Sequence, residues 1–388
     1  DLDILLKEIG DARIVLLGES THGTSEYYTW RTAISKRLIQ EKGFDFIAVE
    51  GDWDDCYKVN EFIKGPPQDS TAVIHLLQQY NRWPTWMWSN HEIASLVHWL
   101  NQYNQNKSAE NKTGFYGMDV YSFWKWTENF SSDDSVLQDA AAGVKKCFSS
   151  YENDALKYAS AVRKKNADCR AITENLWNAV RSRVNKKLKS EENFILHQHA
   201  VLALNGERYF RTMVSNRAQS WNIRDRHMAE TIKRLLKFHG KNSKAIIWAH
   251  NGHVGDAHYS DMSASGYSSI GEMLHNELKH AETFSVGLGT YKGSVMAGRY
   301  WDAPMEKLTV LPAKGGSWEF ILHQIGTGDK LLLSKDIRNN SQLNKWIEFR
   351  AIGASFSEWA LYGRSVIPQR FNAFVFIDST NALHPLKK

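Results

Sequence analysis

The stretch IVLLGESTHG, residues 14–23, decides the fold class and also points to a functional site. Its first four residues form a continuous apolar run, which is typical of a strand buried on both faces of a parallel sheet. The run stops at a glycine, and Glu19 and His22 follow before a second glycine. Polar side chains of this kind are costly to bury unless they are paired. The stretch therefore predicts a parallel sheet whose strand ends carry unusual polar groups.

Further apolar runs, most of them rich in β-branched residues, alternate with helical patterns along the chain. They lie at residues 44–52, 114–120, 244–253, 284–290 and 371–378. After the first run, Tyr27, Ile34 and Leu38 recur at helical spacing, and Gly43 is a stop signal. Strands that alternate with helices predict an α/β fold with a mostly parallel central sheet flanked by helices.

Residues 121–240 have a different composition. They are polar, rich in Lys, Asn, Ser and Ala, and contain no convincing strand pattern. We interpret them as a long helical insertion packed on the α/β core. The core itself is then predicted in two parts, residues 1–120 and 241–388.

Composition limits the class of protein. The chain has 388 residues, of which 42% are hydrophobic and 23% charged, as is typical of soluble globular proteins. No apolar run approaches the roughly 18–20 residues that a membrane helix requires, so we expect no membrane partner. The first ten residues carry acids rather than a basic segment, so no signal peptide is visible. The chain starts without Met, so the earlier removal of a leader peptide stays an alternative.

The positive charge of the chain does not indicate a nucleic-acid partner. The net charge is +5, and much of the excess lies in residues 163–170 and 181–189. These basic residues accompany no recognisable nucleic-acid-binding motif. We therefore expect them to form a solvated helix face.

The cysteines predict a reducing compartment. Cys56, Cys147 and Cys169 are widely spaced and form no CxxC pair. A sparse and odd set of this kind argues against a disulfide framework and against a thiolate metal site. The sequence therefore predicts a cytoplasmic protein.

The polar residues collect at the predicted carboxyl ends of the strands, where ligands bind in open parallel sheets. They are Glu19 and His22 after the first strand, Glu50 and Asp52 after the second, Asp119 after the third, and His250 and His253 after the fourth. Each residue alone has a structural explanation, such as a helix cap, a turn or a hydrogen-bonded histidine. Because four strand ends share the pattern, we predict one functional cleft.

Arg31 adds a cation to this set. It follows Tyr27 by four residues and precedes Ile34 by three, which places it on the apolar stripe of its helix. A buried guanidinium needs a partner, and Glu19 and Glu50 are available from neighbouring strand ends. The alternative is that Arg31 extends along the helix face to solvent.

The residue types favour hydrolysis by direct attack of water. The sequence GESTH does not match the G-x-S-x-G elbow, which argues against Ser20 as a nucleophile, and no phosphate-binding glycine motif occurs. Imidazole is a suitable general base near neutral pH, and a carboxylate can orient it. Further histidines and an Arg can hold the carbonyl oxygen. Alternatively, the acidic and histidine residues bind a divalent metal, with the set Glu19, His22, Glu50, His250 and His253 as ligands.

Several segments together resemble the erythromycin esterase family. They are GESTHGTSEYYTWR (18–31), IAVEGDW (47–53), FYGMDVYS (115–122), WNIRDRHMAE (221–230), WAHNGHVGD (248–256), RAIG (350–353) and FNAFVFIDSTNALHP (371–385). The resemblance implies hydrolysis of a macrolide lactone, with His22 as the general base. The supporting residues that it implies are Glu19, Arg31, Glu50, His250 and His253.

The resemblance also implies that no cofactor is required, although wider relatives that share the Glu and His of the first motif include metal-dependent proteases. Residues 47–65 are similar to a branch of homologues whose substrates are mostly unassigned. We therefore expect a small-molecule ester or macrolide as substrate. A second function class is a non-catalytic homologue that binds a metal or small ligand.

We also expect a substrate-binding region between the carboxyl edge of the sheet and the helical insertion. Its predicted residues are Asp52, Trp53, Tyr116 and Asp119, with further aromatic lining from Trp83, Trp86 and Trp88. The alternative for the aromatic run RWPTWMW, residues 82–88, is a place in the core.

Overall fold

The computed structural model describes most of the chain, in two compact units. The described residues are 2–121, 125–128, 130, 132–151, 154–164, 168–184, 190–278, 282–326, 328–356 and 362–386. Unit 1 comprises Asp1–Gly51, Asp55–Tyr116 and Asn242–Lys388, and unit 2 comprises Asp52–Asp54 and Gly117–Lys241.

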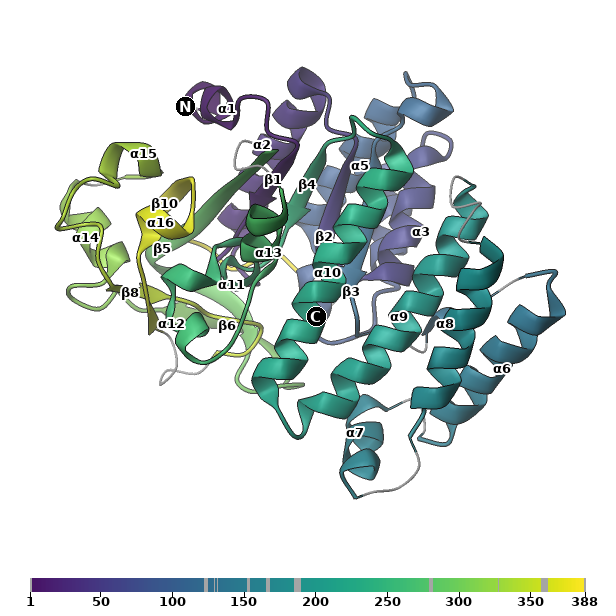
Figure 1. Cartoon of the computed structure of the whole chain (residues 1–388). Coiled ribbons are helices and arrows are strands. Elements are labelled where there is room, and N and C mark those ends of the chain that lie inside the picture. The colour runs from purple at the N-terminus through teal and green to yellow at the C-terminus, as the bar shows by residue number, and fades with distance from the viewer. Residues whose placement is uncertain are drawn as a thin grey trace. The chain divides into compact units, whose positions relative to one another are not determined.

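Unit 1 is built on a central sheet with the strand order β3-β2-β4-β1-β5-β10-β7, and β6 pairs with β5 (Figure 1). The strands are β1 (Ile14–Leu17), β2 (Phe46–Asp52), β3 (Gly114–Asp119), β4 (Ala245–Trp248), β5 (Thr283–Gly298), β6 (Met305–Val310), β7 (Lys330–Leu333) and β10 (Ala373–Thr380). Neighbouring strands from β2 to β10 are parallel, whereas β6 and β7 pair antiparallel. The predicted strands and the mostly parallel sheet are confirmed. A small second sheet pairs β8 (Ile347–Arg350) with β9 (Tyr362–Ser365).

Helices surround this sheet, and most of them are short. They are α1 (Leu2–Ile9), α2 (Ser25–Lys42), α3 (Trp53–Lys64), α4 (Ser70–Leu77), α5 (His91–Asn104), α11 (Asn251–Val254), α12 (Asp261–Ala264), α13 (Ile270–Glu277), α14 (Trp318–Gln324), α15 (Ser334–Ile337) and α16 (Ile367–Arg370). Three 3-10 turns, η1 (Thr85–Met87), η2 (Ala109–Asn111) and η4 (Ala257–Tyr259), connect them. None of the described helices is long and apolar enough to cross a membrane.

Helix α2 follows its sequence pattern. It begins after Thr24 and ends at Gly43, whose φ of 65° is the left-handed conformation that glycine adopts without strain. Its predicted apolar stripe, Tyr27, Ile34 and Leu38, is fully buried. The predicted helix is thus confirmed, including its stop signal.

The strand order creates a switch point between β1 and β4. The chain leaves β1 through α2 and passes β4 to reach β2, whereas it leaves β4 through α11 and α13 and passes β1 to reach β5. Because both crossovers are right-handed, the connecting helices cover opposite faces. In Figure 1, α11 and α13 lie in front of the sheet and α2 lies behind it. Ligands of open α/β sheets bind where the connections diverge in this way.

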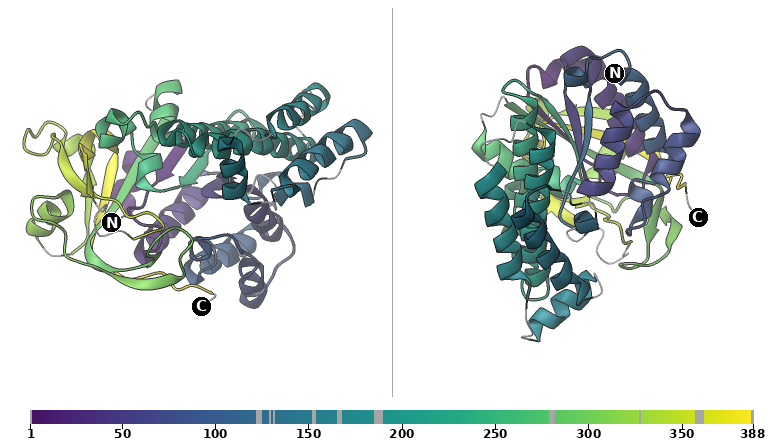
Figure 2. Two further views of the ribbon diagram at one scale, coloured as in Figure 1. Left: turned by 90° about the horizontal axis from the view of Figure 1, so that it is seen from below. Right: turned by 90° about the vertical axis from the view of Figure 1, so that its right-hand side faces the viewer.

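Unit 2 is helical in its described part. Residues between 121 and 240 form η3 (Lys125–Glu128), α6 (Ser135–Ser149), α7 (Ala155–Arg163), α8 (Arg170–Val184), α9 (Glu191–Met213) and α10 (Arg217–His239). The long helices α9 and α10 run side by side in both figures of the whole chain (Figures 1 and 2). Arg181 and Arg183 are exposed on α8, as a solvated face requires, whereas residues 165–167 and 185–189 lie outside the described residues. The packing of this segment on the sheet stays a prediction.

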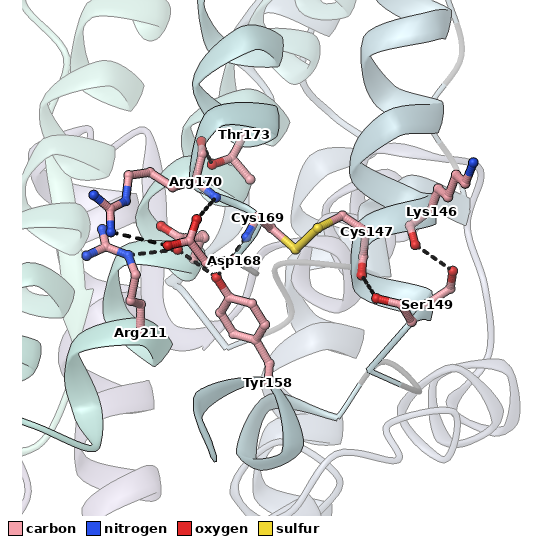
Figure 3. The surroundings of a disulfide bond; sticks show 11 residues. Lys146, Cys147, Ser149, Tyr158, Asp168, Cys169, Arg170, Thr173 and Arg211 are labelled. Carbon is pink, nitrogen blue, oxygen red and sulfur yellow. Dashed lines mark hydrogen bonds and ion pairs between the residues drawn. A yellow bond between two sulfur atoms is a disulfide. The ribbon is translucent and has the colours of Figure 1, made fainter. Parts of the chain in front are cut away.

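The prediction that the cysteines form no disulfide is wrong. Cys147 on α6 and Cys169, just before α8, form a disulfide bond 22 residues apart (Figure 3). The backbone N–H of Cys169 also donates to the hydroxyl of Tyr158, 3.2 Å away. Packing of α6 against α8 brings the two thiols together, and sequence spacing alone does not reveal such packing. The argument for a reducing compartment loses its basis, because disulfides persist mainly in oxidising ones.

Cys56 differs from the other two cysteines, since it is buried and free. We expect an alkylating reagent, applied to the unfolded and unreduced chain, to label Cys56 alone. After reduction, all three cysteines should react. Mass spectrometry of the labelled peptides distinguishes the two cases, and labelling of Cys147 without reduction would contradict the disulfide.

His227 on α10 makes the stability of unit 2 depend on pH. Its side chain is buried, and its pKa is lowered to about 3, chiefly by burial and then by the charge of Arg234. The unfolded chain titrates near pH 6.5 and so binds the proton first. Stability is therefore full above about pH 6.5 and falls as the pH drops toward about 3.

We expect His227→Gln to flatten this dependence by about 1.4 kcal/mol per pH unit between roughly pH 4 and 6. Urea unfolding at several pH values measures it. An equal slope in wild type and His227→Gln would refute the assignment.

Candidate active site

Glu19 and His22 form a buried pair at the end of β1. The Nδ1 atom of His22 lies 2.8 Å from Oε1 of Glu19, and the two residues are 8% and 1% exposed. An ionised carboxylate only accepts hydrogen bonds, so Nδ1 of His22 carries the proton and Nε2 keeps its lone pair. The hydroxyl of Tyr28 donates to the backbone carbonyl of His22 at 3.1 Å. The sequence thus places a fixed basic nitrogen, Nε2, at the switch point.

Arg31 is the partner of Glu19, as one of the two sequence alternatives predicts. Its guanidinium lies 2.6 Å from Oε2 of Glu19 and is fully buried. The rings of Tyr28 and Trp248 lie 4.4 and 4.6 Å from the guanidinium carbon, a cation–π arrangement that stabilises a buried cation. The alternative in which Arg31 reaches solvent is therefore wrong, and Arg31 acts on the site through Glu19.

Glu50 connects three strand ends. Its Oε1 lies 3.2 Å from Nε2 of His253 and 4.0 Å from Nε2 of His22. Its Oε2 accepts the backbone N–H of His250 at 2.9 Å. The carboxylate of Glu50, near the carboxyl end of β2, is thus bound to the segment after β4 and faces the basic nitrogen of His22.

His250 presents a neutral ring to the same place. Its ring centre lies 5.2 Å from that of His22. Its Nδ1 accepts the N–H of Gly252 at 3.1 Å, so the proton of the neutral ring sits on Nε2. That buried Nε2 makes no hydrogen bond with the described residues. Burial lowers the pKa of His250 to about 3. The ring is therefore a neutral hydrogen-bond donor at physiological pH.

The five acidic and histidine residues do not fit a divalent metal in this arrangement. A metal centre needs at least three ligand atoms that converge, and no three from Glu19, His22, Glu50, His250 and His253 lie within 4.8 Å of one another. The geometry favours acid–base chemistry over metal ligation at this site.

Asn251, which the sequence analysis missed, locks the histidine segment to the sheet. Its side-chain amide donates to the carbonyl of Leu288 at 2.7 Å and accepts the Leu288 N–H at 3.2 Å. Its backbone N–H donates to the carbonyl of Glu19 at 2.7 Å. A Cβ atom at Gly18 would lie 2.1 Å from its Oδ1, which explains the first glycine of the opening stretch. The position of Asn251 between His250 and His253 is the signal in the sequence that could have identified it.

The second glycine of that stretch also marks a close approach. A Cβ atom at Gly23 would lie 1.8 Å from the carbonyl oxygen of Met296 on β5. The N–H of Met296 donates to the carbonyl of Gly23 at 2.9 Å. The loop that carries Glu19 and His22 is thus fixed at both ends by contacts that only glycine allows.

We expect Asn251→Ala to lower kcat while KM changes little, because the segment with His250 and His253 loses its anchor. Asn104→Ala is a matched control, since Asn104 is a buried amide in the same unit that bonds Thr113 and Ile63 backbone groups. Each variant should lose about 2–3 kcal/mol of unfolding free energy, measured by urea unfolding. Only Asn251→Ala should lose turnover in the folded enzyme, and equal kcat values would contradict the positioning role.

The predicted substrate-binding residues do not join this cluster as one group. Tyr116 is buried on β3, with its hydroxyl bonded to Lys64 and its ring 5.8 Å from Phe46. Phe46 begins β2, and Glu50 is four residues farther along, about 13 Å at strand spacing. Tyr116 therefore packs at the other end of the strands, and its predicted binding role is not supported.

Asp52, Trp53 and Asp119 belong to unit 2. Both carboxylate oxygens of Asp119 bind the guanidinium of Arg224, at 2.8 and 2.5 Å. Trp53 is buried, with its ring centre 6.0 Å from that of Phe194, and Asp52 is buried as well. These contacts explain Asp119 and Trp53 structurally, and their role toward a substrate stays a prediction.

The aromatic run 82–88 divides between core and surface. Trp86 and Trp88 are buried in the main core, which supports the core alternative for them. Trp88 also lies beside Gly51, since a Cβ there would come within 2.9 Å of its Nε1. Trp83 is partly exposed and packs 4.6 Å from the exposed Trp301. Among the three, only Trp83 offers a ring face near the surface.

The sequence model of the erythromycin esterase family matches residues 39–380. The chain belongs to the erythromycin esterase family. The matched region contains Glu50, His250 and His253, whereas Glu19, His22 and Arg31 precede it. Membership of this family of esterases supports a hydrolase function.

Two named relatives of this erythromycin esterase family member are distant. An Escherichia coli erythromycin esterase type II is 24% identical over 76% of this chain and 73% of its own length. A Bacillus subtilis hydrolase, YbfO, is 22% identical over 83% of this chain and 74% of its own length.

Solved structures extend the likeness over nearly the whole chain. A Bacillus cereus protein matches with a TM-score of 0.79 and 21% identity, covering 99% of this chain and 92% of its own. The erythromycin esterase EreC, solved as a mutant in an open conformation, has a TM-score of 0.68 and 17% identity, covering 98% and 94%. At these identities the likeness establishes the family fold, and the chemistry has to be argued from the site.

Proposed function

We propose that this protein hydrolyses a carboxylic ester or lactone with a water molecule activated by His22. The observation that carries the proposal is the fixed tautomer of His22. Glu19 holds its Nδ1 proton at 2.8 Å, which leaves Nε2 basic and directed toward Glu50. An oriented imidazole with a free nitrogen is the requirement for general base catalysis.

The reaction uses the described residues in two steps. First, Nε2 of His22 takes a proton from water, and the water oxygen forms a bond to the ester carbonyl carbon. The carboxylates of Glu19 and Glu50 stabilise the resulting imidazolium. Next, His22 returns the proton to the leaving alkoxide oxygen as the carbon–oxygen ester bond breaks. The products are an alcohol and a carboxylic acid, and the acid then loses its proton to solvent as a carboxylate. The two groups remain joined if the substrate is a lactone.

His250 has the properties required to stabilise the oxyanion. The carbonyl oxygen becomes negative when water adds, and a donor already in place at that oxygen lowers the barrier. The Nε2–H of the neutral His250 ring is such a donor, and the ring centre lies 5.2 Å from that of His22. Arg31 contributes indirectly, since its guanidinium binds Oε2 of Glu19 at 2.6 Å and holds that carboxylate in place.

The direct test is mass spectrometry of erythromycin and a panel of simple esters and lactones after incubation with the protein. Erythromycin is included because the Escherichia coli relative is named for it. The gain of one water by erythromycin would support a macrolide lactonase. Hydrolysis of other esters alone would keep the mechanism and change the substrate. No hydrolysis in the panel, with the protein folded, would favour the ligand-binding alternative.

A further inference from the structure

A second cluster of ionisable side chains lies on the segment that follows the active-site histidines. It consists of Asp256, His258 and Glu272, from η4 and α13 in unit 1. The Nδ1 atom of His258 lies 3.2 Å from Oδ1 of Asp256 and 3.6 Å from Oε1 of Glu272. Within the described part of the chain, it is the one group of three such residues whose ligand atoms all lie within 4.8 Å of one another.

These distances match the edges of a metal coordination tetrahedron. Zinc binds imidazole nitrogen and carboxylate oxygen at about 2.0–2.2 Å. Ligand atoms at that radius in tetrahedral geometry are separated by about 3.3–3.6 Å. The two separations from His258 fall close to this range. A single N–H on Nδ1 cannot donate well to two carboxylates in different directions, whereas one cation can bind all three groups.

The charge of the cluster also suits a divalent ion. Two carboxylates and a neutral imidazole carry a charge of −2, which one divalent ion neutralises. Imidazole together with carboxylates favours zinc and similar transition metals over magnesium, which prefers oxygen ligands alone. The charge of Arg370 acts on Asp256 and limits the affinity.

The elements that carry the three ligands are held rigidly together. The hydroxyl of Ser269 donates to the carbonyl of Gly255 at 2.7 Å. A Cβ atom at Gly271 would lie 2.1 Å from the carbonyl oxygen of Val254, so α13 packs directly on the end of α11. The backbone N–H of His258 donates to Asp256 at 2.9 Å and fixes that carboxylate. A preformed ligand set on rigid elements is what metal binding requires.

We propose that Asp256, His258 and Glu272 bind one divalent transition-metal ion of the zinc class, separately from the catalytic cluster. The ion joins η4 to α13 two residues beyond α11, which carries His253. Its binding stabilises this part of unit 1, since a ligand that binds only the folded chain raises the unfolding temperature.

The test is isothermal titration of the full, chelator-treated protein with zinc chloride, with magnesium chloride as the comparison ion. We expect one zinc ion per chain and a zinc-dependent rise in unfolding temperature. His258→Gln and Glu272→Gln should each lower zinc affinity at least about tenfold and abolish the rise, because each removes one of three ligands.

Two control variants separate this site from other histidine–carboxylate pairs. His384→Gln removes a histidine that bonds Glu92 at 2.7 Å on the surface, and it should bind zinc like wild type. His22→Asn changes the catalytic pair and should also bind zinc like wild type. Loss of binding in His22→Asn, with retention in His258→Gln, would place the ion at the catalytic cluster and overturn the proposal. Absence of zinc binding by the wild type at about 100 μM would overturn it as well, and would leave the hydrogen bond between His258 and Asp256 as the explanation of the cluster.

Discussion

His22→Asn should lower kcat/KM by about 10²–10⁴-fold, because it removes the general base and keeps a polar side chain of similar reach. Steady-state kinetics on an ester from the panel measures the loss. Circular dichroism and urea unfolding should show an intact fold. Retention of more than about a tenth of the activity would exclude His22 as the base.

His384→Asn is a matched control for this experiment. His384 also bonds a glutamate through Nδ1, at 2.7 Å from Glu92, but its side chain is 66% exposed and outside the cluster. It should retain full activity. A comparable loss in both variants would mean that the assay reports stability rather than catalysis. Glu19→Gln should then distinguish orientation from base function, with a smaller loss than His22→Asn.

Arg31→Met should lower the unfolding free energy by about 3–5 kcal/mol, because it leaves the carboxylate of Glu19 buried without its cation. The same change should reduce turnover, since Glu19 loses the partner of its Oε2 atom and holds His22 in place less well. Chemical unfolding and kinetics on the surviving folded protein measure both effects.

Arg37→Met is the control on the same helix. Arg37 pairs with Asp3 and Glu41 at the surface, where ion pairs contribute little. The double variant Arg31→Met/Glu19→Gln should be more stable than Arg31→Met alone, since it no longer buries an unpaired charge. If Arg31→Met were no less stable than Arg37→Met, the buried pair of Arg31 and Glu19 would not contribute to the stability of the fold.

The residues of the site could be predicted from the sequence because one physical rule applies to several strands at once. The carboxyl ends of parallel strands meet at one edge, so Glu19, His22, Glu50 and His250 were expected to meet. Arg31 was expected to pair because burying an unpaired guanidinium is costly, and extension to solvent was the alternative. Both inferences use only local pattern and the cost of burying charge.

Other features depend on contacts that local pattern does not encode. The bond between Cys147 and Cys169 requires the packing of α6 on α8, and spacing alone argued against it. Asp119 pairs with Arg224 from α10, and nothing near Asp119 in the sequence indicates that partner. The side-chain amide of Asn251 takes the place of backbone partners at Leu288. This contact can be predicted only when the strand register is known.

The position of β4 has a consequence for how the chain folds during synthesis. Strand β4 pairs with both β1 and β2, yet it is translated only at Ala245, after all of unit 2. Until then β1 and β2 have no strand between them, and each presents an unpaired apolar edge. Such edges invite association with other chains, and pairing over long sequence separation is slow. We therefore expect a product truncated before β4 to aggregate.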